Sequence, residues 1–266
     1  MFPKFFFCQG CSIPTRTPLC TPCKESLYWN EQLLPSPAQS IEAVAPLLIS
    51  LERGQKLIRR WKEHRGSSLA RLLFRMPTGL RRKLLELHIL AIIPIPQNQT
   101  RSYERGHDSA SEVARFFSEN LSIPILPLLE LRDPNPQRQT GTSRFDRDYS
   151  KNPFGISRNI DRTGSVYQRV LDQGKQGTSA RFLIVDDLIT SGSTLSKASS
   201  MVKDWIPDSR CWAGSLGFRP RLANARATQC HSNPEPPELP RVALPEAKGQ
   251  NAVPPAPLTL TDQGHP

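Results

Sequence analysis

The segment 181–194 constrains the fold of this chain more than any other part of it. Its sequence, RFLIVDDLITSGST, begins with an apolar, β-branched run that is typical of a buried parallel strand. Two adjacent acids, Asp186 and Asp187, end that run, and a short turn around Gly192 leads into a helical pattern over 194–206. A strand, a tight turn and a helix in this order predict an α/β fold.

The turn itself has the chemistry of an anion-binding site. The first amides of a helix point outward, and the helix dipole favours a negative charge beside them. Gly192 allows the backbone to approach a phosphate closely. Hydroxyl donors surround it at Thr190, Ser191, Ser193 and Thr194. Open α/β sheets bind ligands at the carboxyl ends of their strands, so we predict that this turn holds a phosphate group.

The two acids fit a sugar better than a phosphate. Carboxylates repel phosphates but accept hydrogen bonds well from vicinal ribose hydroxyls. The alternative is that Asp186 and Asp187 only cap a helix and that the hydroxyl residues form an ordinary turn. The combination of strand, acids and hydroxyl-rich turn favours the phosphate–ribose interpretation. On this basis Asp187→Ala should weaken ligand binding and leave the fold nearly intact.

Other segments extend the α/β pattern. The run ILAIIPI at 89–95 predicts a second buried strand, and CWAGSLGF at 211–218 predicts a weaker one. Ser109 and Glu112 form a candidate capping box at the start of an amphipathic helix. Residues 122–155 look irregular, and 156–178 resemble a loop insertion. We therefore expect a parallel sheet flanked by helices.

The region 41–88 predicts basic helices. Between Arg53 and Lys83 the chain has 11 Lys and Arg residues against one acid, Glu63. Such a surface attracts anions, and Trp61 could stack on a base of single-stranded DNA. The alternative is a solvated basic helix whose tryptophan packs in the core. The sequence leaves both open.

Four of the six cysteines form two CxxC pairs in the first 30 residues: Cys8, Cys11, Cys20 and Cys23. Each tight turn can direct two thiolates at one metal ion, and two turns complete a closed tetrahedral zinc site. A closed site is structural, because no open position is left for chemistry. Two disulfides or a redox pair are the alternatives. Cys211 and Cys230 are expected to be plain thiols.

Composition adds limits on partners and location. The net charge of +11 and the pI near 9.7 indicate an anionic partner. No apolar run reaches the roughly 18–20 residues of a membrane span, and we expect a cytoplasmic protein. Residues 31–40 predict a linker before a domain at 41–218. The segment 219–266 contains 10 prolines and predicts a disordered tail.

The chain resembles a known family in these features. Segment 182–194 is similar to the phosphoribosyl diphosphate signature of type I phosphoribosyltransferases. Together with the four-cysteine module, the likeness extends over about residues 5–218 to the ComF family of phosphoribosyltransferase-like competence proteins. The resemblance implies that fold, a structural zinc ion, and ribose contacts from Asp186 and Asp187, which would be the catalytic acids.

Further motifs carry the resemblance. The family has a Pro-x-Pro step and an arginine-rich turn, matched here by 94–96, Arg101, Arg105 and Gly106, although His107, Asp108 and Ser109 replace its usual Phe-Asn-Gln. A later family segment is matched by these residues: Gln139, Thr140, Arg144, Arg147, Asn152 and Phe154. The resemblance implies that Arg101, Arg105 and Arg144 bind the diphosphate, because clustered arginines clamp phosphates bidentately.

Two functions follow from the likeness. The first is a role in DNA uptake and transformation, with a retained phosphoribosyl site, contacts to single-stranded DNA and DNA-processing proteins as partners. The alternative is a nucleobase phosphoribosyltransferase of salvage, in which Mg²⁺ and arginines stabilise the departing diphosphate. The sequence does not identify a base-recognition segment.

Overall fold

The computed structural model describes residues 6–50, 52–63, 69–133, 152–175 and 179–219. Contacts within the chain place all of the described residues in the first compact unit of the chain. The predictions made for Gln139, Thr140, Arg144 and Arg147 lie outside the described residues. The same holds for the predicted disorder of the tail from residue 220 onward.

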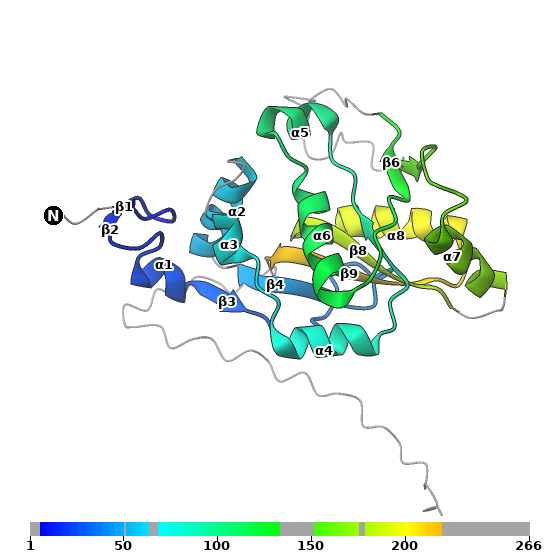
Figure 1. Cartoon of the computed structure of the whole chain (residues 1–266), viewed down its shortest axis with the longest axis horizontal. Helices are drawn as coiled ribbons and strands as arrows, with labels where there is room; N and C mark the ends of the chain where they lie inside the picture. Colours follow the sequence, from blue (N-terminus) through cyan, green and yellow to red (C-terminus); the bar gives the residue numbers. More distant parts are fainter. Residues whose placement is uncertain (1–5, 51, 64–68, 134–151, 176–178, 220–266) are drawn as a thin grey trace, which may run out of the picture. The chain divides into compact units, whose positions relative to one another are not determined.

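A five-stranded, mostly parallel sheet forms the centre of the first unit (Figure 1). Its spatial order is β3 (Leu27–Trp29), β4 (Val44–Ser50), β9 (Arg210–Phe218), β8 (Arg181–Ile189) and β5 (Ala91–Pro94). The last four strands run parallel, and β3 pairs antiparallel with β4 at one edge. The predicted α/β class with a parallel sheet is confirmed.

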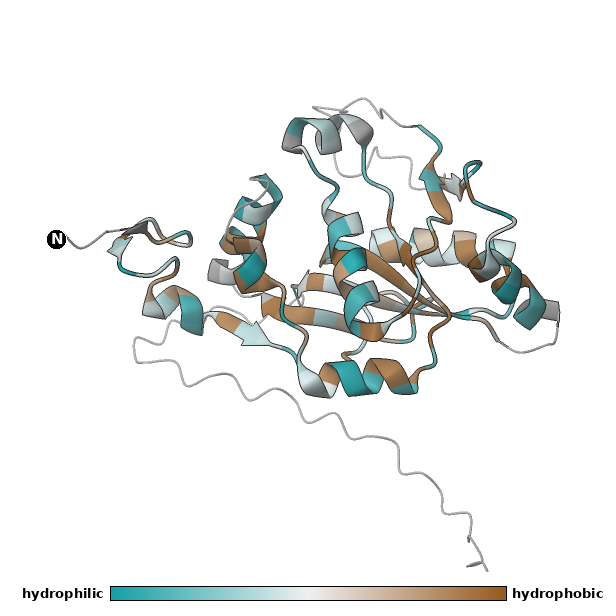
Figure 2. Cartoon of the chain, viewed as in Figure 1, coloured by the Kyte–Doolittle hydropathy of each residue, from teal (hydrophilic) through white to brown (hydrophobic). Residues whose placement is uncertain are grey.

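Helices cover both faces of this sheet, which explains why its strands are almost continuously apolar. One face packs against α2 (Glu52–Glu63), α3 (Leu69–Leu73), α4 (Thr78–Glu86) and α6 (Ser109–Leu121). The other packs against α7 (Ser165–Lys175) and α8 (Ser193–Trp205). Along β8, Leu183 and Val185 face the first group, whereas Phe182 and Ile184 face the second. Figure 2 shows the same division, with apolar residues on the strands and on the helix sides facing them.

Three short pieces complete the described fold. The amino-terminal module consists of β1 (Phe6–Phe7), β2 (Pro14–Thr15) and α1 (Thr21–Glu25). Helix α5 (Gln99–Arg105) follows β5, and β6 (Leu129–Leu131) pairs antiparallel with β7 (Phe154–Ile156). Among the described helices, each is too short or too polar to cross a lipid bilayer.

The structure corrects several expectations about secondary structure. The region 41–88 is not wholly helical, because β4 occupies Val44–Ser50 in the interior of the sheet. The supposed loop insertion 156–178 contains the helix α7. Neither segment has a strong period of its own, and packing against the sheet determines the structure of both.

The predicted linker 31–40 and the predicted capping box are also corrected. Ala38 is 5% exposed and packs in the core beside α8, so this segment is part of the fold. Helix α6 is capped by Asp108, whose carboxylate accepts from the Ser111 amide at 3.0 Å. Ser109 therefore does not cap the helix, and its hydroxyl is available for another contact.

Candidate phosphoribosyl site and four-cysteine module

The predicted acids lie near the carboxyl end of β8, the interior strand between β9 and the edge strand β5. Successive side chains of a strand point to opposite faces. Asp187 continues the row of Leu183 and Val185 toward α2 and α6, so alternation directs Asp186 toward the face of α8. The two acids therefore have different surroundings.

Asp187 is an internal acceptor rather than a free carboxylate. It is 4% exposed, and its Oδ2 atom receives three donors from three other segments. Lys62 Nζ of α2 lies at 2.6 Å, and Gln97 Nε2 lies at 2.9 Å. The Ser109 hydroxyl, at the start of α6, donates to the same oxygen. These contacts fix the carboxylate and balance its charge.

Asp186 has a different environment. The Asp187 amide donates to its Oδ1 atom at 2.8 Å, and the residue keeps partial exposure. Burial, followed by the charge of the adjacent Asp187, raises the pKa of Asp186 to about 7, and the charge of Lys62 acts in the lowering direction. A carboxyl group poised near neutrality at the end of a central strand is a common feature of ligand sites.

The turn after β8 has the predicted strand–turn–helix geometry. Gly192 adopts φ 73° and precedes α8, and Thr190, Ser193 and Thr194 are exposed. Ser191 is partly buried, and its hydroxyl lies 3.1 Å from that of Ser193. The turn therefore offers hydroxyl groups and helix amides together, as an anion site requires.

The structure gives a reason of its own for a glycine at position 192. A Cβ atom there would lie 2.9 Å from Pro37 Cγ and 3.2 Å from Ala38 Cβ. Such distances are too short for ordinary packing, and the positive φ adds strain for any other residue. Gly192 is thus required by the left-handed conformation and by the segment packed against it.

The other predicted contacts divide into two groups. Arg101 and Arg105 belong to α5, and their side chains lie outside the described part of the structure, as does Arg144. Asn152 binds the backbone, donating to the Lys197 carbonyl at 2.8 Å, and Phe154 is buried in the core. The latter two residues therefore have structural roles in the described fold.

Sequence reasoning missed Lys62, Gln97 and Ser109 as partners of Asp187. Each is an ordinary polar residue in its local context, and only the assembled sheet brings the three together. Gln97 also donates to the Ser109 hydroxyl at 2.7 Å, and its buried Oε1 atom has no hydrogen-bond partner within the described residues. That oxygen is an unpaired hydrogen-bond acceptor in a cluster whose other polar groups are paired.

The stacking role considered for Trp61 is wrong. Its side chain is 2% exposed and packs edge-on against Phe74, with ring centroids 5.3 Å apart. It also lies beside the ring of His107, at 5.7 Å between centroids. Trp61 and His107 are therefore part of the core between α2 and α6, where a tryptophan contributes packing and not base recognition.

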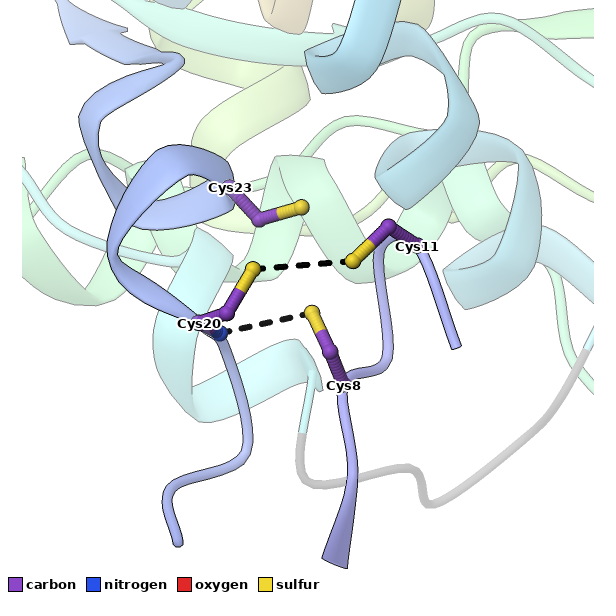
Figure 3. Close-up of side chains that lie close together, drawn as sticks. All are labelled: Cys8, Cys11, Cys20 and Cys23. Carbon is purple, nitrogen blue, oxygen red and sulfur yellow. Dashed lines mark hydrogen bonds between the residues drawn. The ribbon is translucent and has the colours of Figure 1, made fainter. Parts of the chain in front are cut away.

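The four cysteines come together as the spacing predicts (Figure 3). The four sulfur atoms all lie within 4.8 Å of one another. A tetrahedral zinc ion with Zn–S bonds of about 2.3 Å would require sulfur atoms about 3.8 Å apart, so the cluster can hold such an ion after small adjustments. A closed set of four thiolates fits a structural metal site.

Electrostatics support a cation at this place. Burial would raise the pKa of Cys8, but amide hydrogen bonds from Cys20, Cys11 and Gly10 outweigh it and lower the pKa to about 6. Burial and the neighbouring sulfur atoms raise the pKa of Cys23 to about 12. The charge of one thiolate thus disfavours ionisation of the next thiol, and a bound dication would remove that repulsion.

The module is attached to the rest of the fold by specific contacts. Arg60 of α2 donates to the Gln9 carbonyl, and its Nη2 atom lies 2.9 Å from Ser12 Oγ. A Cβ atom on Gly10 would lie 2.7 Å from Cys23 Sγ and 3.4 Å from Leu57 Cδ2 of α2. The turn between the first two cysteines therefore rests directly on α2.

A surface hollow of about 560 Å³ lies on α4, apart from the carboxylates and the turn after β8. Its lining consists of Thr78, Arg81, Arg82, Leu85, Glu86 and His88. The hollow belongs to the basic region, and no described residue of the phosphoribosyl candidate lines it.

Comparison with known proteins supports the resemblance drawn from the sequence. No protein-family model matches the chain. The chain is 28% identical over 212 residues to competence protein F of Haemophilus influenzae, in a match that covers 74% of this chain and 83% of that protein. The likeness to the ComF family is thereby confirmed.

Proposed function

Starting from the likeness to a competence protein, we propose that the chain acts in DNA uptake and carries a binding site for phosphoribosyl diphosphate. One observation carries the ligand proposal. A partly exposed carboxylate, Asp186, is followed by a glycine turn with the exposed hydroxyls of Thr190, Ser193 and Thr194 at the start of α8. The acid and the turn lie at the carboxyl end of β8, an interior parallel strand, and open sheets of this kind bind ligands at the carboxyl ends of their strands.

Each part of the ligand has a candidate partner. The amides and hydroxyls at the start of α8 would hold the 5-phosphate. Asp186 would accept from a ribose hydroxyl, and Asp187 would support it from the other face of the strand. Arg101, Arg105 and Arg144 would contact the diphosphate together with Mg²⁺, as the family resemblance implies.

Calorimetric titration with phosphoribosyl diphosphate and Mg²⁺ tests the site. Removing the two exposed hydroxyls in the first turn of α8, as Ser193→Ala with Thr194→Ala, should weaken binding about tenfold through lost hydrogen bonds to phosphate. Ser200→Ala is the matched control. Ser200 is exposed on the same helix, and its hydroxyl donates to the Ser196 carbonyl of that helix. Equal affinities for all three proteins would refute the assignment.

Transfer chemistry defines the alternative function. In salvage, the bond between C1 of the ribose and the diphosphate breaks through an oxocarbenium-like centre, and a base nitrogen forms the new bond. Incubation with phosphoribosyl diphosphate, Mg²⁺ and a panel of bases would release diphosphate if the chain catalyses this step. Turnover with a base, together with no affinity for DNA, would replace the DNA-uptake proposal with the salvage one.

A contact with single-stranded DNA would rely on the exposed cations of α2–α4. Arg60 and Lys62 are engaged inside the fold, whereas Arg59 and Arg82 are exposed and Arg82 lines the hollow on α4. The double variant Arg59→Gln with Arg82→Gln should reduce the salt slope of DNA binding by about 1–2.

The control for this experiment is Arg162→Gln with Arg169→Gln, because both arginines are exposed near or on α7. It removes the same charge from another part of the fold. If the control lowers the slope as much as the first pair, DNA contacts the protein through its general charge, and α2–α4 do not form a specific interface.

We also propose that the metal held by the four cysteines is zinc. Thiolate-only, tetrahedral sites in short CxxC pairs select zinc over harder cations. The ion would be structural, and its contribution would be to fix the turns on which Arg60 rests. Metal analysis of the purified protein should give one zinc per chain.

A further inference from the structure

Helix α2 contacts both the four-cysteine module and the carboxylate site through residues that are nearly adjacent. Arg60 holds the module through the Gln9 carbonyl and the Ser12 hydroxyl. Lys62 holds Asp187, with 2.6 Å between Nζ and Oδ2. Only about half a turn of helix therefore separates the two attachments.

The contact with the module involves the part that a metal would shape. Gln9 lies between the thiols of Cys8 and Cys11, and Ser12 follows the second of them directly. The Cys8 sulfur receives amides from Gly10 at 3.4 Å and Cys20 at 3.3 Å, so the position of the turn depends on that sulfur. Arg60 therefore binds groups whose places are determined by the cysteine cluster.

The helix between the two attachments is held rigidly. Trp61 is buried between them against Phe74 and His107, and Leu57 and Ile58 are also buried. Close-packed interiors transmit displacements because they contain few voids. A rotation or shift of α2 would therefore move the Lys62 ammonium relative to Asp187.

We propose that Arg60 and Lys62 are positioning residues through which the metal-loaded module holds Asp187 in its binding arrangement. The affinity of the site for its ligand then depends on metal in the module, although no cysteine is close in sequence to the residues of that site. This inference rests on the proposed function, because it assigns a consequence to binding at the same site. Arg60 would act through α2 and Lys62 without touching the ligand.

A double-mutant cycle tests the link in the full chain, with affinity for phosphoribosyl diphosphate and Mg²⁺ as the readout. Arg60→Met and Lys62→Met should each weaken binding about tenfold, because Lys62→Met removes a partner of Asp187 and Arg60→Met releases the helix that positions that partner. Glu63→Met should stay within about twofold, because Glu63 is an exposed residue of the same helix, next to Lys62. Lys62→Arg should recover most of the affinity that Lys62→Met loses.

Non-additivity is the decisive result. If Arg60 acts through Lys62, the variant carrying both methionines should bind no more weakly than Lys62→Met alone. Removing the metal with a chelator should likewise weaken the wild type and leave Lys62→Met unchanged. Additive losses, an unchanged Arg60→Met affinity, or an unchanged wild-type affinity after metal removal would each overturn the proposal.

A second readout separates this proposal from the proposed function. If the wild type does not bind phosphoribosyl diphosphate, the ligand assignment fails, and hydrogen exchange without ligand tests the link. Arg60→Met should increase amide exchange several-fold at residues 186–189 and at the start of α6, relative to Glu63→Met. Equal exchange in the two variants would overturn the link on its own.

Discussion

The ammonium of Lys62 and the carboxylate of Asp187 lie 2.6 Å apart, with side chains 23% and 6% exposed. Two further donors, from Gln97 and Ser109, reach the same carboxylate oxygen. A charge held in this way is costly to leave without its partner, because water cannot fully replace it. The pair therefore determines both the stability and the arrangement of the candidate site.

We expect Asp187→Asn to destabilise the protein by about 2 kcal/mol, since it leaves the Lys62 charge partly buried and unpaired. This reverses the expectation from sequence alone that the fold would be spared. Urea unfolding at pH 7 measures the effect, and Asp204→Asn, at an exposed position on α8, is the control. Lys62→Met combined with Asp187→Leu should recover most of the loss. Equal midpoints for Asp187→Asn and the control would contradict the prediction.

Asp186→Asn should stabilise the protein above neutral pH. Burial, followed by the charge of Asp187, raises the pKa of Asp186 from 3.8 to about 7 in the folded protein. The folded state therefore holds this proton more tightly, and the wild type loses stability as the pH rises from about 4 to 7. Asparagine does not titrate, so its advantage should grow over that range to on the order of 2–4 kcal/mol.

The measurement is the free energy of unfolding at several pH values between 4 and 8. Asp161→Asn provides a contrast, because the hydroxyl and amide of Thr163 lower the pKa of Asp161. Asp161→Asn should therefore lower the free energy of unfolding over the same pH range, whereas Asp186→Asn should raise it. A pH-independent difference between Asp186→Asn and the wild type would show that Asp186 titrates normally.

Gly192→Ala should cost about 1–3 kcal/mol of stability and weaken phosphate binding. The added methyl group requires φ near 73° and meets Pro37 Cγ at 2.9 Å. Gly155→Ala is the matched control, because a Cβ there meets its nearest atom, Arg132 Cγ, at 3.5 Å. Thermal unfolding compares the two variants, and equal losses would remove the special role of position 192.

Cys8→Ser should abolish metal binding, because the hydroxyl is a poor ligand in a set of thiolates. We expect the zinc content to fall from one ion per chain to a small fraction, and exchange to rise over residues 6–29. Cys211→Ser is the control, since Cys211 is a buried thiol of β9 and lies outside the cluster. Retention of zinc by Cys8→Ser would refute the four-thiolate site.

The parts of the fold that sequence reasoning recovered are those with local determinants. The strand and helix on either side of Gly192 follow from a β-branched run, a turn and a helical period. The cysteine pairs are equally local, because two residues separate the members of each pair. Both predictions therefore needed no knowledge of the tertiary structure.

The missed features depend on distant partners. The segment containing β4 includes Pro46 and follows a polar stretch, and it is a strand because it pairs with β9. Ser109 matched the pattern of a helix cap, yet Asp108 caps the helix and the Ser109 hydroxyl binds Asp187. Side chains from α2 and α6 meet at β8 only in the assembled fold, so no local pattern could reveal the Asp187 cluster.

The antiparallel pairing of Leu27–Trp29 with Leu48–Ser50 has a consequence for truncated forms of the protein. A fragment beginning after residue 30 would leave the outer hydrogen-bonding groups of an apolar strand uncovered. Such a rim is a template for association between molecules, and the shortened protein should form oligomers or precipitate at concentrations where the full chain does not. By covering the edge of β4, the amino-terminal segment thus also prevents self-association.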